Sequence, residues 1–198
     1  SPVVAAPSDA RGVWVWVEQA EGKAHSISWE MIGQGRHLAD ALQVPLTACV
    51  LGAGIGEIAP EAIAYGADRV LLVDHPELAM FRTEAYALAL RQLIEKERPE
   101  ILLLGASSRG RDLAGSVATS LHTGLTADCT GLEIDPQTRL LLQTRPAYGG
   151  NIMATITTPA HRPQMATVRH RVFDVPEPDP SRRGDTVSVE VPLAADSL

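Results

Sequence analysis

Apolar positions follow two alternating patterns through the first 135 residues of the chain. Short runs rich in β-branched and aromatic residues predict strands at residues 12–18, 45–51, 69–73 and 100–104. Segments with apolar residues three and four positions apart predict helices at 28–43, 58–65, 81–97 and 111–123. The strands are nearly continuous apolar runs separated by helices. The pattern therefore predicts a parallel sheet covered on both faces, in a three-layer α/β core.

The helix ends carry their own signals. Ser28 is positioned to cap the first helix, with Glu30 in its first turn. Gly66 and Gly124 follow the second and fourth helices, where a glycine commonly ends a helix. Pro99 stops the third helix, because the residue before a proline disfavours helical geometry.

After residue 128 the helical pattern disappears. Strand-like segments at 128–135, 139–145, 151–157 and 164–168 follow one another, which predicts hairpin strands added to the α/β core. Residues 174–184 are rich in proline and charge and predict a linker, followed by a short strand at 186–191. We therefore expect a disordered segment at 1–10, an α/β domain at 11–173, and a linker with a short strand at 174–198.

Composition narrows the class of protein. The chain has 198 residues, 45% of them hydrophobic, and a formal net charge of −7 without a run of Lys or Arg, so a nucleic-acid partner is not expected. No stretch has the roughly 18 continuous apolar residues of a membrane span. The first ten residues lack the basic start and apolar block of a signal peptide. With only two cysteines, Cys49 and Cys129, a reduced cytoplasmic setting is expected.

The motifs of common enzyme classes are missing from the sequence. The six histidines have no metal-ligand spacing, no GxSxG motif is present, and neither cysteine has the flanking residues of a nucleophile. Residues 52–56 contain three glycines, but their position and spacing differ from a dinucleotide fingerprint and indicate a turn. The sequence therefore predicts no catalytic residues, no metal site and no enzyme activity of its own.

The segment 104–112 joins a predicted strand to a predicted helix through small residues. Backbone amides there could approach an anion at the helix N-terminus, with Ser107 and Arg109 as additional donors to a phosphate or carboxylate. The same residues also fit a tight turn with a serine cap and arginines paired to nearby acids. Both interpretations remain open from the sequence.

A second polar loop, at residues 145–151, interrupts an otherwise apolar hairpin. Arg145 could hold an anion or a negatively charged ring, Tyr148 could pack on a planar ligand, and Asn151 ends the loop. The alternative is a glycine bulge with Arg145 as a salt-bridge donor. The sequence does not decide between them.

Four segments, 105–112, 124–135, 143–156 and 162–169, together resemble the alpha subunit of electron transfer flavoproteins, and residues 12–18 fit its first strand. The resemblance implies an adenine-nucleotide-hydrolase-like fold that pairs with a beta subunit. It further implies FAD as cofactor, an acyl-CoA or related dehydrogenase as partner, and a flavin or nucleotide near Arg145, Tyr148, Asn151, Ser107 and Arg109.

Two departures from the family accompany this resemblance. Members of the family usually continue into a C-terminal domain that holds most of the FAD, so this chain alone is not expected to retain the cofactor. His170 also stands where a proline is common.

Three functions are therefore compared. The first is the amino-terminal part of an electron-carrier subunit, a scaffold that positions and tunes a flavin. The second is a free-standing nucleotide-binding module or hydrolase, for which residues 18–23 lack the Ser-Gly-Gly-x-Asp loop of ATP pyrophosphatases. The third is a purely structural interaction domain.

Overall fold

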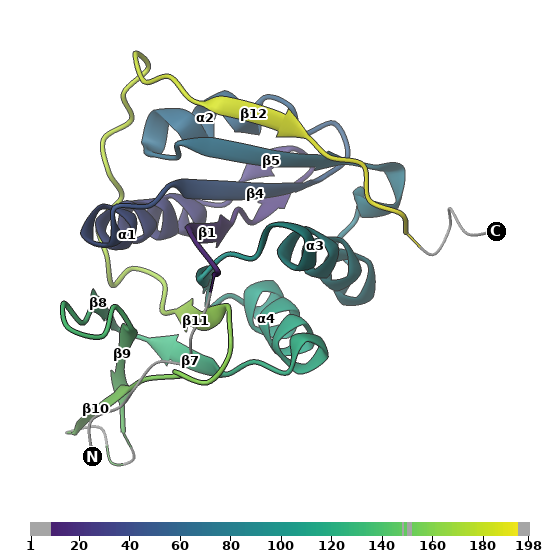
Figure 1. The fold of residues 1–198 in the computed structure, drawn as a ribbon. Coiled ribbons are helices and arrows are strands. Elements are labelled where there is room, and N and C mark those ends of the chain that lie inside the picture. The colour runs from purple at the N-terminus through teal and green to yellow at the C-terminus, as the bar shows by residue number, and fades with distance from the viewer. Residues whose placement is uncertain (1–8, 148, 150–151, 194–198) are drawn as a thin grey trace.

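The computed structural model describes residues 9–147, 149 and 152–193. Its main sheet is parallel, with the strand order β12-β5-β4-β1-β6-β11-β7 (Figure 1). These strands are β1 (Val13–Trp16), β4 (Leu46–Gly52), β5 (Arg69–Asp74), β6 (Ile101–Gly105), β7 (Leu125–Cys129), β11 (Gln164–Val168) and β12 (Asp185–Ser188). The helices are α1 (Ile27–Leu42), α2 (Ile58–Tyr65), α3 (Thr83–Glu97) and α4 (Ser108–Leu121), with a 3₁₀ turn η1 at Pro76–Leu78. The predicted three-layer α/β architecture is confirmed.

Each face of the main sheet is buried under its own hydrophobic core. Along β1, Val13 and Val15 point into the core beneath α1 and α2, whereas Trp14 and Trp16 point into the core beneath α3 and α4. All four residues are at most 2% exposed. This burial on both faces explains why the strand has no polar position, as expected for a parallel sheet between helical layers.

Two smaller antiparallel sheets complete the fold. β8 (Gly131–Ile134), β9 (Leu141–Pro146) and β10 (Met153–Ile156) form the predicted hairpin addition, and β2 (Gln19–Ala20) pairs with β3 (Lys23–Ala24). Leu132 and Leu141 extend the core beneath α1, so the hairpin sheet packs against the domain. Figure 1 shows this sheet beside α1, at the opposite side of the molecule from β12.

The segment 128–135, expected as one strand, divides between two sheets. Asp128 has a left-handed backbone (φ 58°), and its amide donates to Thr167 Oγ1 over 2.8 Å. This irregularity ends β7 in the parallel sheet before β8 begins in the hairpin sheet. Residues 164–168 were expected within the hairpin addition. They instead form β11 between β6 and β7, inside the parallel sheet.

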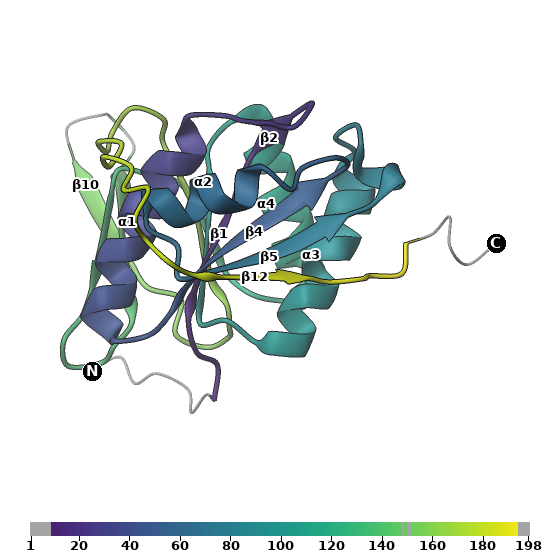
Figure 2. The ribbon, with the colours of Figure 1, turned by 90° about the horizontal axis from the view of Figure 1, so that it is seen from above.

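The expected linker lies against the core. The amide of Asp179 donates to the carbonyl of Ala64 over 2.8 Å, and Arg182 donates to the carbonyls of Ile63 and Gly66 at the end of α2. The chain then enters β12, which pairs with β5 at the edge of the main sheet (Figure 2). A domain boundary at residue 173 stays a prediction, but residues 179–188 are in contact with the α/β core.

Candidate functional site

The carboxyl ends of β1 and β6 meet at the switch point of the sheet. The chain winds from β1 outward through β4 to β5, and then crosses to β6 on the other side of β1. Connections that leave neighbouring strands in opposite directions open a crevice, which is where open α/β sheets commonly bind ligands. Glu18 follows β1 at this position, and Ser107 follows β6.

The protein's own side chains fill this crevice. Ser107 Oγ accepts the amide of Gly110 over 3.0 Å as the N-cap of α4, and its hydroxyl donates to Glu18 Oε1. A Cβ on Gly105 would overlap the Ile27 side chain, which packs directly on this turn. These contacts agree with the turn-and-cap interpretation of Ser107.

Glu18 also explains why Ser28 does not cap α1. The hydroxyl of Ser28 donates to the carbonyl of Glu18 over 3.0 Å, and Ser26 occupies the N-cap position without a side-chain hydrogen bond. The predicted cap at Ser28 is therefore wrong. The serine instead fastens the start of α1 to the end of β1.

The glycine-containing loop at 52–56 is likewise occupied by the chain. The Gln19 side chain packs against Gly52 and donates to the carbonyl of Leu51 over 3.0 Å. The amide of Gly54 donates to Asp74 Oδ1 over 3.0 Å. These contacts agree with a turn rather than a dinucleotide-binding loop.

Arg109 lies on the α3 side of the crevice. Its guanidinium stands 5.4 Å from the centre of the Phe81 ring, beside a cavity of about 190 Å³ that Gln19 and Tyr86 also line. The Tyr86 hydroxyl donates to the carbonyl of Leu78 over 2.6 Å, and burial raises the pKa of this phenol. Arg109 is thus engaged with an aromatic cluster.

Arg145 lies on the other side of α4, on β9 opposite Ala154 of β10. It is half-buried, and its charge lowers the pKa values of Asp128 and Cys129, although burial raises the pKa of Cys129 to about 11 overall. Arg145 therefore influences Asp128 and Cys129, whereas Arg109 contacts Phe81, so the two arginines do not share a contact. Tyr148 and Asn151 fall outside the described residues, so their predicted contacts stay predictions.

The strongest ion pair near Arg145 was not recognised in the sequence. Arg169 follows β11 and donates to both carboxylate oxygens of Asp128, with distances of 2.7 and 3.2 Å. These hydrogen bonds are the main reason that the pKa of Asp128 is lowered, and Arg111 and Arg145 contribute further. The sequence gives no signal for this pair, because residues 164–168 were expected in the hairpin addition and not beside β7 in the parallel sheet.

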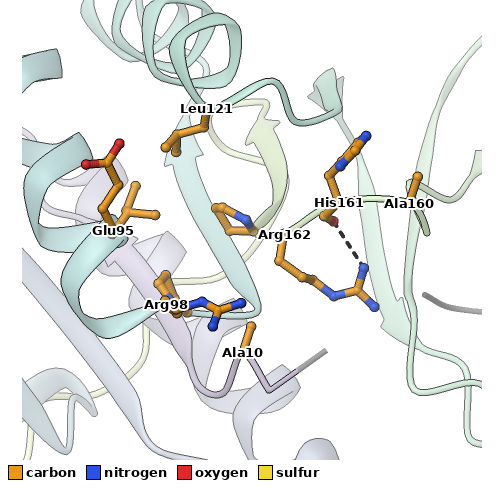
Figure 3. Close-up of a pocket in the computed structure, with 10 residues that line it drawn as sticks. Ala10, Glu95, Arg98, Leu121, Ala160, His161 and Arg162 are labelled. Carbon is orange, nitrogen blue, oxygen red and sulfur yellow. Dashed lines mark hydrogen bonds between the residues drawn. The ribbon is translucent and has the colours of Figure 1, made fainter. Parts of the chain in front are cut away.

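A larger cavity lies at the opposite, amino edge of the sheet. It measures about 390 Å³ and includes Pro99 and Pro163, which precede β6 and β11 (Figure 3). Arg162 donates to the carbonyls of Pro159 and His161, both over 3.0 Å. None of the predicted site residues lines this cavity.

The described residues offer neither a metal-binding cluster nor a helix suited to span a membrane. No group of three or more His, Cys, Asp or Glu side chains there could hold a metal ion. No helix in that part of the chain is both long and apolar enough to cross a membrane.

Comparison with known proteins assigns the family. The electron transfer flavoprotein domain matches residues 13–194. The chain is 48% identical to protein FixB of Azorhizobium caulinodans, covering 94% of this chain and 51% of the relative. It is 45% identical to the electron transfer flavoprotein subunit alpha of Clostridium acetobutylicum, over 96% of this chain and 57% of that relative. It is 44% identical to the electron transfer flavoprotein subunit alpha of Megasphaera elsdenii, over 94% of this chain and 55% of that relative. The chain thus spans about half the length of these relatives, and it belongs to the electron transfer flavoprotein family.

Proposed function

We propose that this chain is the amino-terminal part of an alpha subunit that carries electrons between a dehydrogenase and a second redox partner. The observation that carries the proposal is the family match over residues 13–194, together with 44–45% identity to two proteins named as alpha subunits. The alpha/beta heterodimer, FAD as its cofactor, an acyl-CoA or related dehydrogenase as donor, and a cytoplasmic location all belong to this proposal.

A role as carrier rather than enzyme is supported by the state of the two thiols. Cys49 and Cys129 are both fully buried, and burial raises the pKa of each. A thiol must be accessible and ionised to act as a nucleophile. These cysteines are therefore suited to packing.

The described residues do not enclose a flavin. Glu18 and Ile27 occupy the switch point at Ser107 and Gly105, where a nucleotide would approach the sheet. Arg145 lies apart from this crevice, half-buried on β9. FAD supplies the electron-accepting ring when it is bound in the full assembly. In the proposal, Arg145 stabilises negative charge on that ring from the subunit interface.

The filled crevice also bears on the alternative functions. A stand-alone nucleotide-binding module needs an open switch point. This chain places the Glu18 carboxylate against Ser107 at the α4 N-terminus, where a phosphate would otherwise approach. The observation favours a structural interaction domain over a nucleotide-binding module. A structural role is compatible with a domain that forms part of a heterodimer interface.

Co-purification with the cognate beta subunit, followed by a visible spectrum, tests the proposal. We expect the tagged chain to retain the beta subunit through gel filtration, and the chain alone to show no flavin absorbance. Failure to bind the beta subunit would contradict the heterodimer. A stoichiometric flavin absorbance band from the chain alone would contradict the expectation that this chain does not retain FAD without the rest of the assembly.

A further inference from the structure

Three arginines from three elements surround one carboxylate at the carboxyl edge of the sheet. Arg111 belongs to α4, Arg145 to β9, and Arg169 follows β11. Backbone hydrogen bonds place two of them beside residues 128–130: the amide of Arg169 donates to the carbonyl of Cys129 over 3.0 Å, and the amide of Thr130 donates over 2.8 Å to the carbonyl of Thr144, the neighbour of Arg145. The charges of all three arginines lower the pKa of Asp128. In a chain whose formal net charge is −7, this arginine cluster concentrates positive charge on a small area.

Asp128 can neutralise only one of these arginines. Arg169 takes both of its oxygens, through Nη2 to Oδ2 over 2.7 Å and Nε to Oδ1 over 3.2 Å. Among the residues that the structure describes, no carboxylate lies within ion-pair distance of Arg111 or Arg145. Two guanidinium groups therefore remain without an anionic partner beside the Asp128–Arg169 pair.

The neighbouring end of α4 adds to this positive potential. Arg111 is in the first turns of α4, and the first amides of a helix lack partners within the helix and carry partial positive charge. The Glu18 carboxylate, which accepts from Ser107 at this N-terminus, offsets part of that charge, so Arg111 and Arg145 are the main cations of the site. Arginine offers donors in a planar fork that matches phosphate oxygens.

We propose that the arginine cluster binds a phosphate or pyrophosphate group, with Arg111 and Arg145 as its ligands, beside the Asp128–Arg169 pair, whose carboxylate opposes the anion. The site is separate from the filled crevice at Glu18 and Ser107. It shares Arg145 with the proposed function, but it requires neither flavin nor a beta subunit. Anion binding by the chain alone can therefore fail or succeed independently of electron transfer.

Titration of the 198-residue chain with inorganic pyrophosphate, followed by calorimetry at low and moderate salt, tests the proposal. Arg111→Ala and Arg145→Ala should each weaken binding at least about fivefold, the range of a charge-assisted hydrogen bond to phosphate. Asp128→Asn should strengthen binding, because it removes the negative charge while asparagine still tolerates the left-handed backbone. Added salt should weaken binding throughout.

The matched control is Arg91→Ala, which removes an arginine that is half-buried like Arg145 and paired with Glu95 on α3, and which changes the net charge equally. Its affinity for pyrophosphate should equal that of the wild type. Equal losses in Arg91→Ala and Arg145→Ala would overturn the proposal, as would weaker binding by Asp128→Asn or no binding by the wild type. Parallel titrations with phosphate and adenosine diphosphate separate a free phosphate ligand from a nucleotide.

Discussion

At the scale of single residues, Ser107 and Arg145 illustrate how a polar side chain acquires its role from its neighbours. Ser107 was a candidate ligand for an anion, and the structure gives its hydroxyl to Glu18 and its lone pair to Gly110. Arg145 was a candidate for the same kind of ligand, and the structure leaves it beside a carboxylate that Arg169 already holds. The contacts give Ser107 a structural role as a helix cap, and a role of Arg145 toward a partner stays a prediction.

Replacing Ser107 should destabilise the domain strongly. Ser107→Ala removes the N-cap of α4 and leaves Glu18, which is 8% exposed, without its hydroxyl donor. We expect a loss of roughly 2–4 kcal/mol in the free energy of unfolding, measured by chemical denaturation. Ser107→Thr should retain most of the stability, and Ser108→Ala serves as the control. A loss below about 0.5 kcal/mol for Ser107→Ala would contradict the structural role.

Replacing Arg145 should change the reduction potential of the flavin and leave the stability of the domain nearly unchanged. Arg145→Ala in the reconstituted heterodimer should lower the flavin reduction potential by roughly 30 mV, the equivalent of about one pKa unit for a two-electron couple. Arg145→Lys should recover part of the shift, and the melting temperature of the domain should change little. Redox titration measures the effect. An unchanged potential with a large loss of stability would identify Arg145 as a structural salt-bridge residue.

The Asp128–Arg169 pair should make stability depend on acid pH. The pKa of Asp128 is held below its ordinary value of 3.8, so its ionised form stabilises the folded state above that value. This contribution is lost as the pH falls through the lowered pKa of the folded state. The melting-temperature difference between wild type and Asp128→Asn should therefore be constant above about pH 5 and shrink below pH 3.8. Asp112→Asn, on exposed α4 surface, should show no such change.

At the scale of elements, the sequence predicted most of the parallel core. Helix α2 and strand β11 have the predicted bounds, and α3 begins two residues later than expected. The error at 128–135 arose from Asp128, whose left-handed backbone depends on a hydrogen bond to Thr167, 39 residues away. The charged partners of Ser107 and Asp128 are also remote in sequence: Glu18 is 89 residues from Ser107, and Arg169 is 41 residues from Asp128. Local patterns carry no information about such pairs, so the site could be predicted only as isolated residues.

The docking of β12 can be tested through Gly184. A Cβ at this position would lie 2.7 Å from the carbonyl oxygen of Asp68, so Gly184→Ala must displace the start of β12. Faster amide hydrogen exchange is expected at Asp185 and Val189, whose amides donate to the carbonyls of Asp68, just before β5, and of Leu72 in β5. Gly115→Ala provides the control, because a Cβ there contacts nothing within 4 Å. Unchanged exchange in Gly184→Ala would show that β12 is not held in this way.

At the scale of the whole molecule, the fold presents one apolar edge beside the proposed site. Ile152 and Met153, at the start of β10, are 64% and 53% exposed. They lie on the hairpin sheet that carries Arg145, and exposed apolar patches commonly mark protein interfaces. We therefore expect the beta subunit of the proposed heterodimer to bind against β9 and β10, with Arg145 at the margin of that interface.

Sedimentation velocity of the chain mixed with its cognate beta subunit tests the heterodimer most directly. The account predicts a single 1:1 species for the wild type and for Met80→Asp, which alters a 78% exposed methionine near η1. Met153→Asp should weaken the complex at least about tenfold, because it buries a carboxylate in an apolar interface. Independent sedimentation of the two wild-type proteins would contradict the account.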